Sequence, residues 1–86
     1  MTRLANKVAM ITGASGGIGA AAARRFVAEG AQVLLVDLDE AALRALAGDS
    51  AQMHVCVADV SQPEPMAVCV DVAVQRFGGL DIAVLN

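Results

Sequence analysis

The chain has 86 residues, a formal net charge of −3 and 57% hydrophobic residues, with no Trp or Tyr and only two Phe. A chain of this length forms one small domain. Nucleic acids and anionic membranes bind basic surfaces, so the acidic balance and the lack of any Lys or Arg cluster argue against both as partners.

The first seven residues carry no apolar stretch of the kind that a secretory signal needs, and no apolar run approaches the roughly 20 residues of a membrane span. We therefore expect a cytoplasmic protein. The high apolar content predicts more apolar surface than the chain can cover alone, or else reflects an alanine-rich composition bias. Cys56 and Cys69 show no metal or redox spacing, so we expect small buried thiols rather than a disulfide.

The first expected strand, Val8–Thr12, runs into the glycine-rich turn Thr12-Gly13-Ala14-Ser15-Gly16-Gly17-Ile18-Gly19. A helix is expected over Gly17–Glu29, followed by Gly30 as its C-terminal glycine. Such a turn lets a ligand approach the backbone, and the helix presents unpaired N–H groups to an anion. The inward stripe of this helix is expected from Ile18, Ala21, Ala22, Arg25 and Phe26.

The second strand is expected over Gln32–Asp37. Its centre, residues 33–36, is continuously apolar, which predicts a strand buried on both faces, as in a parallel sheet. The next helix is expected over Glu40–Ala47, with Asp39 as its N-cap and Gly48 at its end.

The third and fourth strands are expected over Met53–Ala58 and Asp81–Leu85, with a helix over Pro63–Phe77 between them. Alternating valines in this last segment also fit a strand, but its length favours a crossover helix. We expect His54, the single histidine, to face solvent at the sheet edge rather than act as a ligand or base. The helical stripe is expected from Met66, Val70, Ala73, Val74 and Phe77.

Two signals for the start of the third helix disagree. Ser61 and Glu64 have capping-box spacing. Pro65 would then remove a first-turn hydrogen bond, and it could push the start to a later residue.

The order β-α-β-α-β-α-β with short connections predicts an α/β fold, a doubly wound parallel sheet of the Rossmann type that is incomplete. Residues 1–86 are expected to form the N-terminal part of a single dinucleotide-binding domain.

Gly17-x-Gly19-x-x-Ala22 is by itself a weak match to the dinucleotide fingerprint. It gains weight because it follows a strand, opens a helix, and precedes Asp37 by about the distance at which the fingerprint expects an acid. The Asp37 carboxylate would accept hydrogen bonds from the adenosine ribose hydroxyls and repel a 2′-phosphate. No basic residue lies in the turn or at Leu38, so NAD is favoured over NADP.

These residues allow a second role for Asp37 and exclude one other kind of phosphate-binding turn. Asp37 could instead be a helix-capping or solvated strand-end acid. A P-loop is excluded, because the turn contains no Lys followed by Ser or Thr.

The motif Thr12-Gly13-x-x-x-Gly17-x-Gly19 resembles the cofactor turn of the short-chain dehydrogenases/reductases. Asp59-Val60 is similar to the acidic-apolar pair that contacts adenine in this family. Residues 77–82 resemble the family's usual run into the fourth strand. Val84-Leu85-Asn86 resembles the start of the family's Asn-Asn-Ala-Gly element, with Leu85 in place of the first Asn.

The resemblance implies that Asp59, Val60 and Asn86 line the cofactor cleft, with Ser15 and the Ile18 backbone near the phosphates. Asp59 could instead cap the third helix. The candidate NAD-binding residues are Gly13, Ser15, Gly17, Ile18, Gly19, Asp37, Leu38, Asp59, Val60 and Asn86.

In this family the catalytic Ser and the Tyr-x-x-x-Lys pair follow the fourth strand. This chain has no Tyr, and Lys7 precedes the first strand, so we expect no catalytic residue and no metal site in it. The resemblance implies the N-terminal half of an oxidoreductase that transfers hydride between nicotinamide and a small alcohol or carbonyl substrate, in a homo-oligomeric parent. The alternative is a non-catalytic nucleotide-binding or assembly module that ends naturally at Asn86.

The family pattern also implies the strand order 3-2-1-4, with the first two helices on one face of the sheet and the third on the other. The fourth strand would then be an open apolar edge, which favours association. We therefore expect these residues alone to form only a weakly stable monomer or none.

Overall fold

The computed structural model describes residues 3–86. Met1 and Thr2, which belong to the segment without a secretory signal pattern, lie outside the described residues. Four strands and three helices alternate in the expected order. The elements are β1 (Val8–Thr12), α1 (Gly17–Ala28), β2 (Gln32–Asp37), α2 (Glu40–Ala47), β3 (Met53–Val57), α3 (Pro63–Phe77) and β4 (Ile82–Val84).

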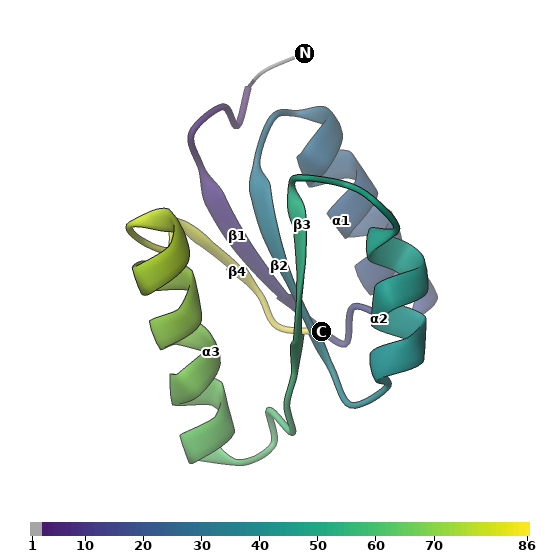
Figure 1. Ribbon diagram of the computed structural model, residues 1–86, viewed down its shortest axis with the longest axis vertical. Helices are drawn as coiled ribbons and strands as arrows, with labels where there is room; N and C mark the ends of the chain where they lie inside the picture. The colour runs from purple at the N-terminus through teal and green to yellow at the C-terminus, as the bar shows by residue number, and fades with distance from the viewer. Residues whose placement is uncertain (1–2) are drawn as a thin grey trace.

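The strands form one parallel sheet in the order β3-β2-β1-β4, which confirms the predicted fold class and strand order. Ile11 is paired with both Leu35 and Val84, so the carboxyl ends of β2, β1 and β4 meet at one edge of the sheet. Helices α1 and α2 cover one face and α3 covers the other (Figure 1). Loops that follow the strands therefore gather at that single edge.

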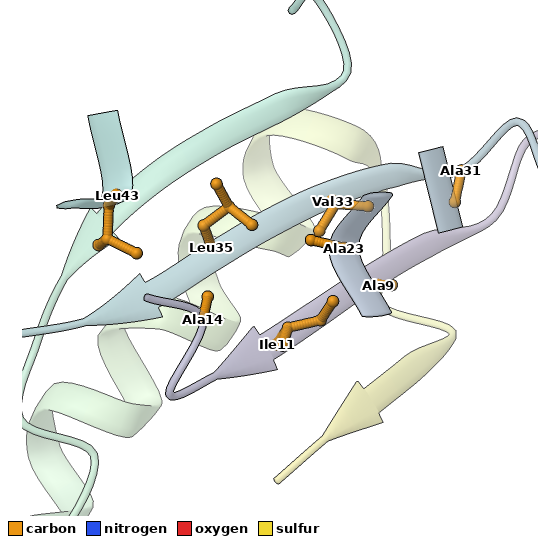
Figure 2. Packing of buried hydrophobic residues seen from close by; sticks show 8 residues of the cluster. All are labelled: Ala9, Ile11, Ala14, Ala23, Ala31, Val33, Leu35 and Leu43. Carbon is orange, nitrogen blue, oxygen red and sulfur yellow. The ribbon is translucent and has the colours of Figure 1, made fainter. Parts of the chain in front are cut away.

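Each face of the sheet has its own apolar core. Along β2, Val33 and Leu35 point to the α1–α2 face, whereas Leu34 and Val36 point to the α3 face. This explains why the strand is continuously apolar. Figure 2 shows the core of the α1–α2 face, which consists of Ala9, Ile11, Ala14, Ala23, Ala31, Val33, Leu35 and Leu43.

The predicted inward stripe of α1 is wrong in part. Three of its five members, Ile18, Ala21 and Arg25, are exposed, and the buried positions of the helix are Gly19 and Ala23. The absence of a side chain at Gly19 lets the helix lie directly against the preceding turn, and this contact sets the rotation of the helix. The helix also ends one residue earlier than expected, with Gly30 following at φ +97°.

The predicted start of α2 is confirmed, because the Asp39 side chain accepts a hydrogen bond from Ala42 N at 3.1 Å. The capping box predicted for α3 is wrong. Gln62 is the N-cap of that helix without a side-chain bond, and Ser61 bonds Asp59 instead. The helix begins at Pro63, so Pro65 does not delay its start. Pro65 lies in the first turn, where a backbone N–H has no partner within the helix, so its missing N–H costs no helical hydrogen bond.

The stripe of α3 also departs from the prediction at one position. Met66, Val70, Ala73 and Phe77 lie toward the sheet as expected, but Val74 is 47% exposed. Cys69, which was not part of the predicted stripe, is fully buried there.

His54 does not face solvent as predicted. It is half-buried, with Nε2 3.1 Å from Gln32 Oε1 and its ring centroid 4.6 Å from that of Phe77. Burial, and secondly the positive charge of Arg76, lower the pKa of His54. The side chain therefore closes the α3 core at the sheet edge.

The two outer strands are shorter than predicted, because β3 ends at Val57 and β4 covers only Ile82–Val84. Within residues 3–86, β4 pairs with β1 alone, so its other edge is open as expected. Leu85, which follows it, is 70% exposed. None of the helices described is long and apolar enough to cross a membrane.

Candidate cofactor site

The turn after β1 is held by backbone hydrogen bonds. Gly13 has φ +62°, a conformation that favours glycine, and its carbonyl accepts a bond from Gly16 N at 3.1 Å. Ala14 is buried beside Leu35 (Figure 2) and donates its N–H to Val36 O at 3.2 Å. The turn is thereby joined to the end of β2.

Gly17 and Gly19 are glycines for different physical reasons. A Cβ at Gly19 would lie 2.4 Å from Gly13 O and 2.9 Å from Ala14 Cα, so no side chain fits where the helix meets the turn. Apart from its chain neighbours and the backbone of its own helix, a Cβ at Gly17 would meet no protein atom within 4 Å. The absence of a side chain at position 17 therefore leaves the space above the turn open, and this space is not filled by another part of the protein.

The N-terminus of α1 is not capped by any side chain. Its N-cap is Gly16, and its first turn contains no acidic residue. Ile18 in the same turn is 77% exposed. The N–H groups and the positive end of the helix dipole thus point into open space, an arrangement that suits an anion such as a phosphate.

Asp37, at the end of β2, is bonded to the turn. Its Oδ2 accepts hydrogen bonds from Ser15 N at 3.1 Å and from the Ser15 hydroxyl, and its Oδ1 accepts one from Leu38 N at 2.7 Å. The Ser15 hydroxyl, followed by the Leu38 amide, lowers the pKa of the Asp37 carboxyl. Asp39 and not Asp37 caps the next helix, so the alternative of a helix-capping role for Asp37 is wrong.

Asp59 and Val60 lie in the connection between β3 and α3. This connection begins beside the end of β2, where Ala58 N donates to Asp37 O at 3.1 Å. Asp59 Oδ1 accepts a bond from Ser61 N at 3.0 Å and another from the Ser61 hydroxyl, and the hydroxyl bond lowers the pKa of Asp59. Asp59 is not the N-cap of α3, whereas Val60 packs against the α3-side core.

Asn86 contacts the turn from the other side. Its backbone N–H donates to Thr12 Oγ1 at 3.0 Å, and its side-chain amide donates to Gly13 O at 3.4 Å. The Thr12 hydroxyl in turn donates to Val84 O at 3.4 Å. The sequence pattern did not distinguish Thr12 from the other residues of the motif. Its buried hydroxyl nevertheless links β4 to the turn through these two hydrogen bonds.

The ten candidate residues therefore gather at the carboxyl edge of the sheet and at the start of α1. The structure brings Ser15 to Asp37 and Asn86 to Gly13, whereas Asp59 bonds only Ser61 through its side chain. The arrangement places free N–H donors at the start of α1 and a carboxylate at Asp37 at the same edge of the sheet. Within residues 3–86 there is no group of three or more side chains that could hold a metal ion.

A hollow of about 510 Å³ lies elsewhere, at the amino end of β3. It is lined in part by Gly48, Met53 and Arg76, far along the strands from the glycine turn. The candidate cofactor site is instead an open surface above the glycine turn. The volume of a cavity therefore does not identify this site.

The sequence model of the family described as short chain dehydrogenase matches residues 7–86. An uncharacterised oxidoreductase of Mycobacterium bovis is 43% identical over 84 residues, which are 93% of this chain and 34% of that protein. The L-fucose dehydrogenase of Mus musculus is 43% identical over 86 residues, which are 100% of this chain and 32% of that protein. The chain thus spans about a third of the length of these relatives.

Two solved structures from Brucella melitensis are also similar. A short-chain dehydrogenase/reductase described as glucose/ribitol dehydrogenase aligns with a TM-score of 0.89 at 38% identity, over 94% of this chain and 35% of its own. A 3-ketoacyl-(acyl-carrier-protein) reductase complexed with NADH aligns with a TM-score of 0.88 at 38% identity, over 93% and 33%.

Proposed function

Since the chain belongs to the short-chain dehydrogenase family, we propose that it is the NAD-binding part of an oxidoreductase that acts on a small alcohol or carbonyl substrate. The nicotinamide cofactor would supply or accept the hydride. Because the chain spans about a third of its relatives, the reaction is proposed for the intact protein, and the residues described here would hold the cofactor.

The glycine turn supports a dinucleotide diphosphate as the ligand. The uncapped N-terminus of α1 offers N–H donors, and the empty space at Gly17 lets a phosphate approach the backbone without meeting a side chain. Without a ligand, a residue with open space around it has no packing reason to be glycine. Gly13 and Gly19 would shape the turn, and Ile18 would flank the phosphates through its backbone.

The observation that carries the choice of NAD is the position of Asp37. Its carboxylate is held beside the turn by Ser15, and its lowered pKa keeps it ionised at neutral pH. A carboxylate there accepts bonds from two ribose hydroxyls, whereas it would repel a 2′-phosphate. The NADH complex of the similar reductase supports a nicotinamide cofactor.

The adenine would lie between the connections that follow β2 and β3. Leu38 is 64% exposed beside Asp37, and Asp59 and Val60 lie in the second connection. The flat face of the adenine ring would pack against Leu38 and cover this exposed side chain. On the far side of the turn, Asn86 would contact the part of the cofactor that lies toward β4.

The chain offers no residue for the chemical step, because it has no Tyr and its only Lys precedes β1. We propose that these residues alone are inactive and that the intact protein is a homo-oligomer. A cytoplasmic location stays a prediction from sequence. The second candidate, a non-catalytic nucleotide-binding module, would bind the dinucleotide but show no turnover with any alcohol or carbonyl in the intact protein.

The test is a titration of the intact protein with NADH and with NADPH, followed by nicotinamide fluorescence. We expect NADH to bind at least about tenfold more tightly, which corresponds to ~1.4 kcal/mol. Equal or tighter binding of NADPH would contradict the proposal. Turnover assays with a panel of alcohols and NAD would then separate the dehydrogenase from the non-catalytic alternative.

A further inference from the structure

The only two cysteines of the chain meet across the α3-side core. Cys56 lies on β3 and Cys69 on α3, and their Sγ atoms are 2.9 Å apart. Cys69 is fully buried, whereas Cys56 is half-buried. The sequence did not predict this contact, because the separation of the two residues matches no redox motif.

The surroundings of the pair suit a disulfide better than a metal ion. The neighbouring side chains of this core are apolar, among them Leu34, Val36 and Ala73. No third metal-ligating side chain joins the two thiols within the part of the chain described. A disulfide has an S–S length of about 2.05 Å, so the two sulfur atoms need to approach by only about 0.9 Å.

We propose that Cys56 and Cys69 form a reversible oxidation site, in which exchange with a low-molecular-weight disulfide such as oxidised glutathione links β3 to α3. In the first step, the Cys56 thiolate attacks one sulfur of the glutathione disulfide and expels one glutathione thiolate. In the second, Cys69 Sγ attacks Cys56 Sγ as its proton passes to the departing glutathione sulfur, so that the second glutathione leaves as a thiol. Two protein thiols are oxidised to one disulfide, and one glutathione disulfide is reduced to two glutathione thiols.

The order of the steps follows from access to solvent. Cys56 is the thiol that a soluble disulfide can reach, since Cys69 is fully buried. Burial raises the pKa of Cys69 to about 12, so it stays protonated until the mixed disulfide stands beside it. Cys69 is therefore the resolving thiol.

The crosslink would span the connection that carries Asp59 and Val60. Residues 58–62 lie between the two cysteines, and Val60 packs in the same core as both of them. Oxidation would hold α3 against the edge strand of the sheet. The crosslink itself does not depend on the proposed cofactor, so its test can succeed or fail independently of nucleotide binding.

The test uses the intact protein in glutathione buffers, followed by acid quenching, alkylation with N-ethylmaleimide and mass spectrometry. Trypsin cleaves after Arg44 and Arg76, so both cysteines fall in the single peptide of residues 45–76. In a buffer with a large excess of oxidised over reduced glutathione, we expect most of this peptide to be unlabelled and lighter by two hydrogens. A second cleavage after Asp59 should leave the two cysteine fragments joined until a reductant is added.

Two variants identify the roles of the thiols. In Cys69→Ala, Cys56 should accumulate as a mixed disulfide with glutathione, whereas in Cys56→Ser, Cys69 should remain a free thiol. For the wild-type protein, two maleimide labels, or a persistent glutathione adduct on Cys56, in the oxidising buffer would overturn the proposal. The wild-type result decides the question even if a variant does not fold.

Discussion

Ser15 donates two hydrogen bonds to a single carboxylate oxygen of Asp37, one from its backbone N–H at 3.1 Å and one from its hydroxyl. Ser15 belongs to the turn after β1, and Asp37 ends β2. These bonds hold the glycine turn, which we propose binds the phosphates, and Asp37, which we propose binds the ribose, at a fixed distance from each other. A ligand that contacts both meets a site that is already ordered, which reduces the entropy cost of binding.

Replacing Asp37 should remove the discrimination between the two nicotinamide cofactors. In Asp37→Asn we expect NADH affinity to fall about tenfold or more, because a charge-assisted hydrogen bond to ribose is lost. NADPH affinity should rise relative to NADH. Titration of both cofactors by fluorescence measures the change. Asp71→Asn on the exposed face of α3 is the matched control and should leave both affinities as in the wild type.

Gly17→Ala should weaken NADH binding and leave the stability of the protein almost unchanged. Apart from its chain neighbours and the backbone of its own helix, the added methyl meets no protein atom within 4 Å, so the free energy of unfolding should stay within about 0.5 kcal/mol of the wild type. The same methyl would occupy the space proposed for the phosphates, so NADH binding should weaken by at least about tenfold. Urea unfolding and NADH titration test the two halves of this prediction. Unchanged affinity would argue against a phosphate at Gly17.

Gly19→Ala makes the same chemical change two residues later, but it should lower the stability of the protein as well as its NADH binding. Its methyl would lie 2.4 Å from Gly13 O, so the helix and the turn must move apart. We expect a loss of stability of about 1–3 kcal/mol, typical of overpacking, together with weaker NADH binding. If Gly19→Ala were as stable as Gly17→Ala, the tight contact of α1 with the turn would be wrong.

Removing the Ser15 hydroxyl should make stability less dependent on pH. The hydroxyl bond lowers the folded-state pKa of Asp37 below its ordinary value of 3.8. A carboxyl with a lowered folded pKa stabilises the protein above the unfolded value and loses that contribution as the pH falls through the folded value. Ser15→Ala should therefore cost about 1 kcal/mol at neutral pH, and the difference should shrink in acid.

Denaturant unfolding of the wild type and Ser15→Ala, from neutral pH downward, measures that difference. Ser61→Ala is a useful comparison, since it removes the corresponding bond to Asp59, away from the turn. A Ser15→Ala penalty that stays constant into acid would show that the bond to Asp37 is not its source.

Thr12→Val should weaken the attachment of β4 to the turn. Valine keeps the shape of the side chain but removes the hydroxyl that accepts from Asn86 N at 3.0 Å, and the site is only 2% exposed. Because Asn86 is exposed and water can reach its amide, loss of this hydrogen bond should cost about 1 kcal/mol. Faster hydrogen exchange at the Asn86 amide, together with a lower free energy of unfolding, would be the signature. Thr12→Ser keeps the hydroxyl and should retain slow exchange.

Residues 1–86 expressed alone should associate through the open edge of β4. Ile82 and Val84 are partly buried against the core, whereas Ala83 between them is exposed, so the edge is both apolar and accessible. Ala83→Lys should reduce association, because a charged side chain opposes pairing with another strand. Sedimentation at several concentrations measures the effect. A wild-type chain that is monomeric and unfolds cooperatively would contradict the expectation.

Local features were predicted from sequence because their causes lie within a few residues. The continuous apolar run of β2 indicated a strand with helices on both faces. Asp39 precedes a helix that it caps, and Gly30 follows a helix that it ends, with φ +97°. The glycine turn and the acid that ends the second strand also follow from spacing along one βαβ unit.

Features that depend on how distant segments pack were missed or predicted wrongly. The rotation of α1 is set by the contact of Gly19 with the turn, and the half-buried position of His54 by the ring of Phe77. The contact between Cys56 and Cys69 and the bond from Asn86 to Thr12 arise only after the strands pair in parallel. Periodicity identifies which elements form and their order, but the contacts between their side chains are decided when the sheet and its helices close around the two cores.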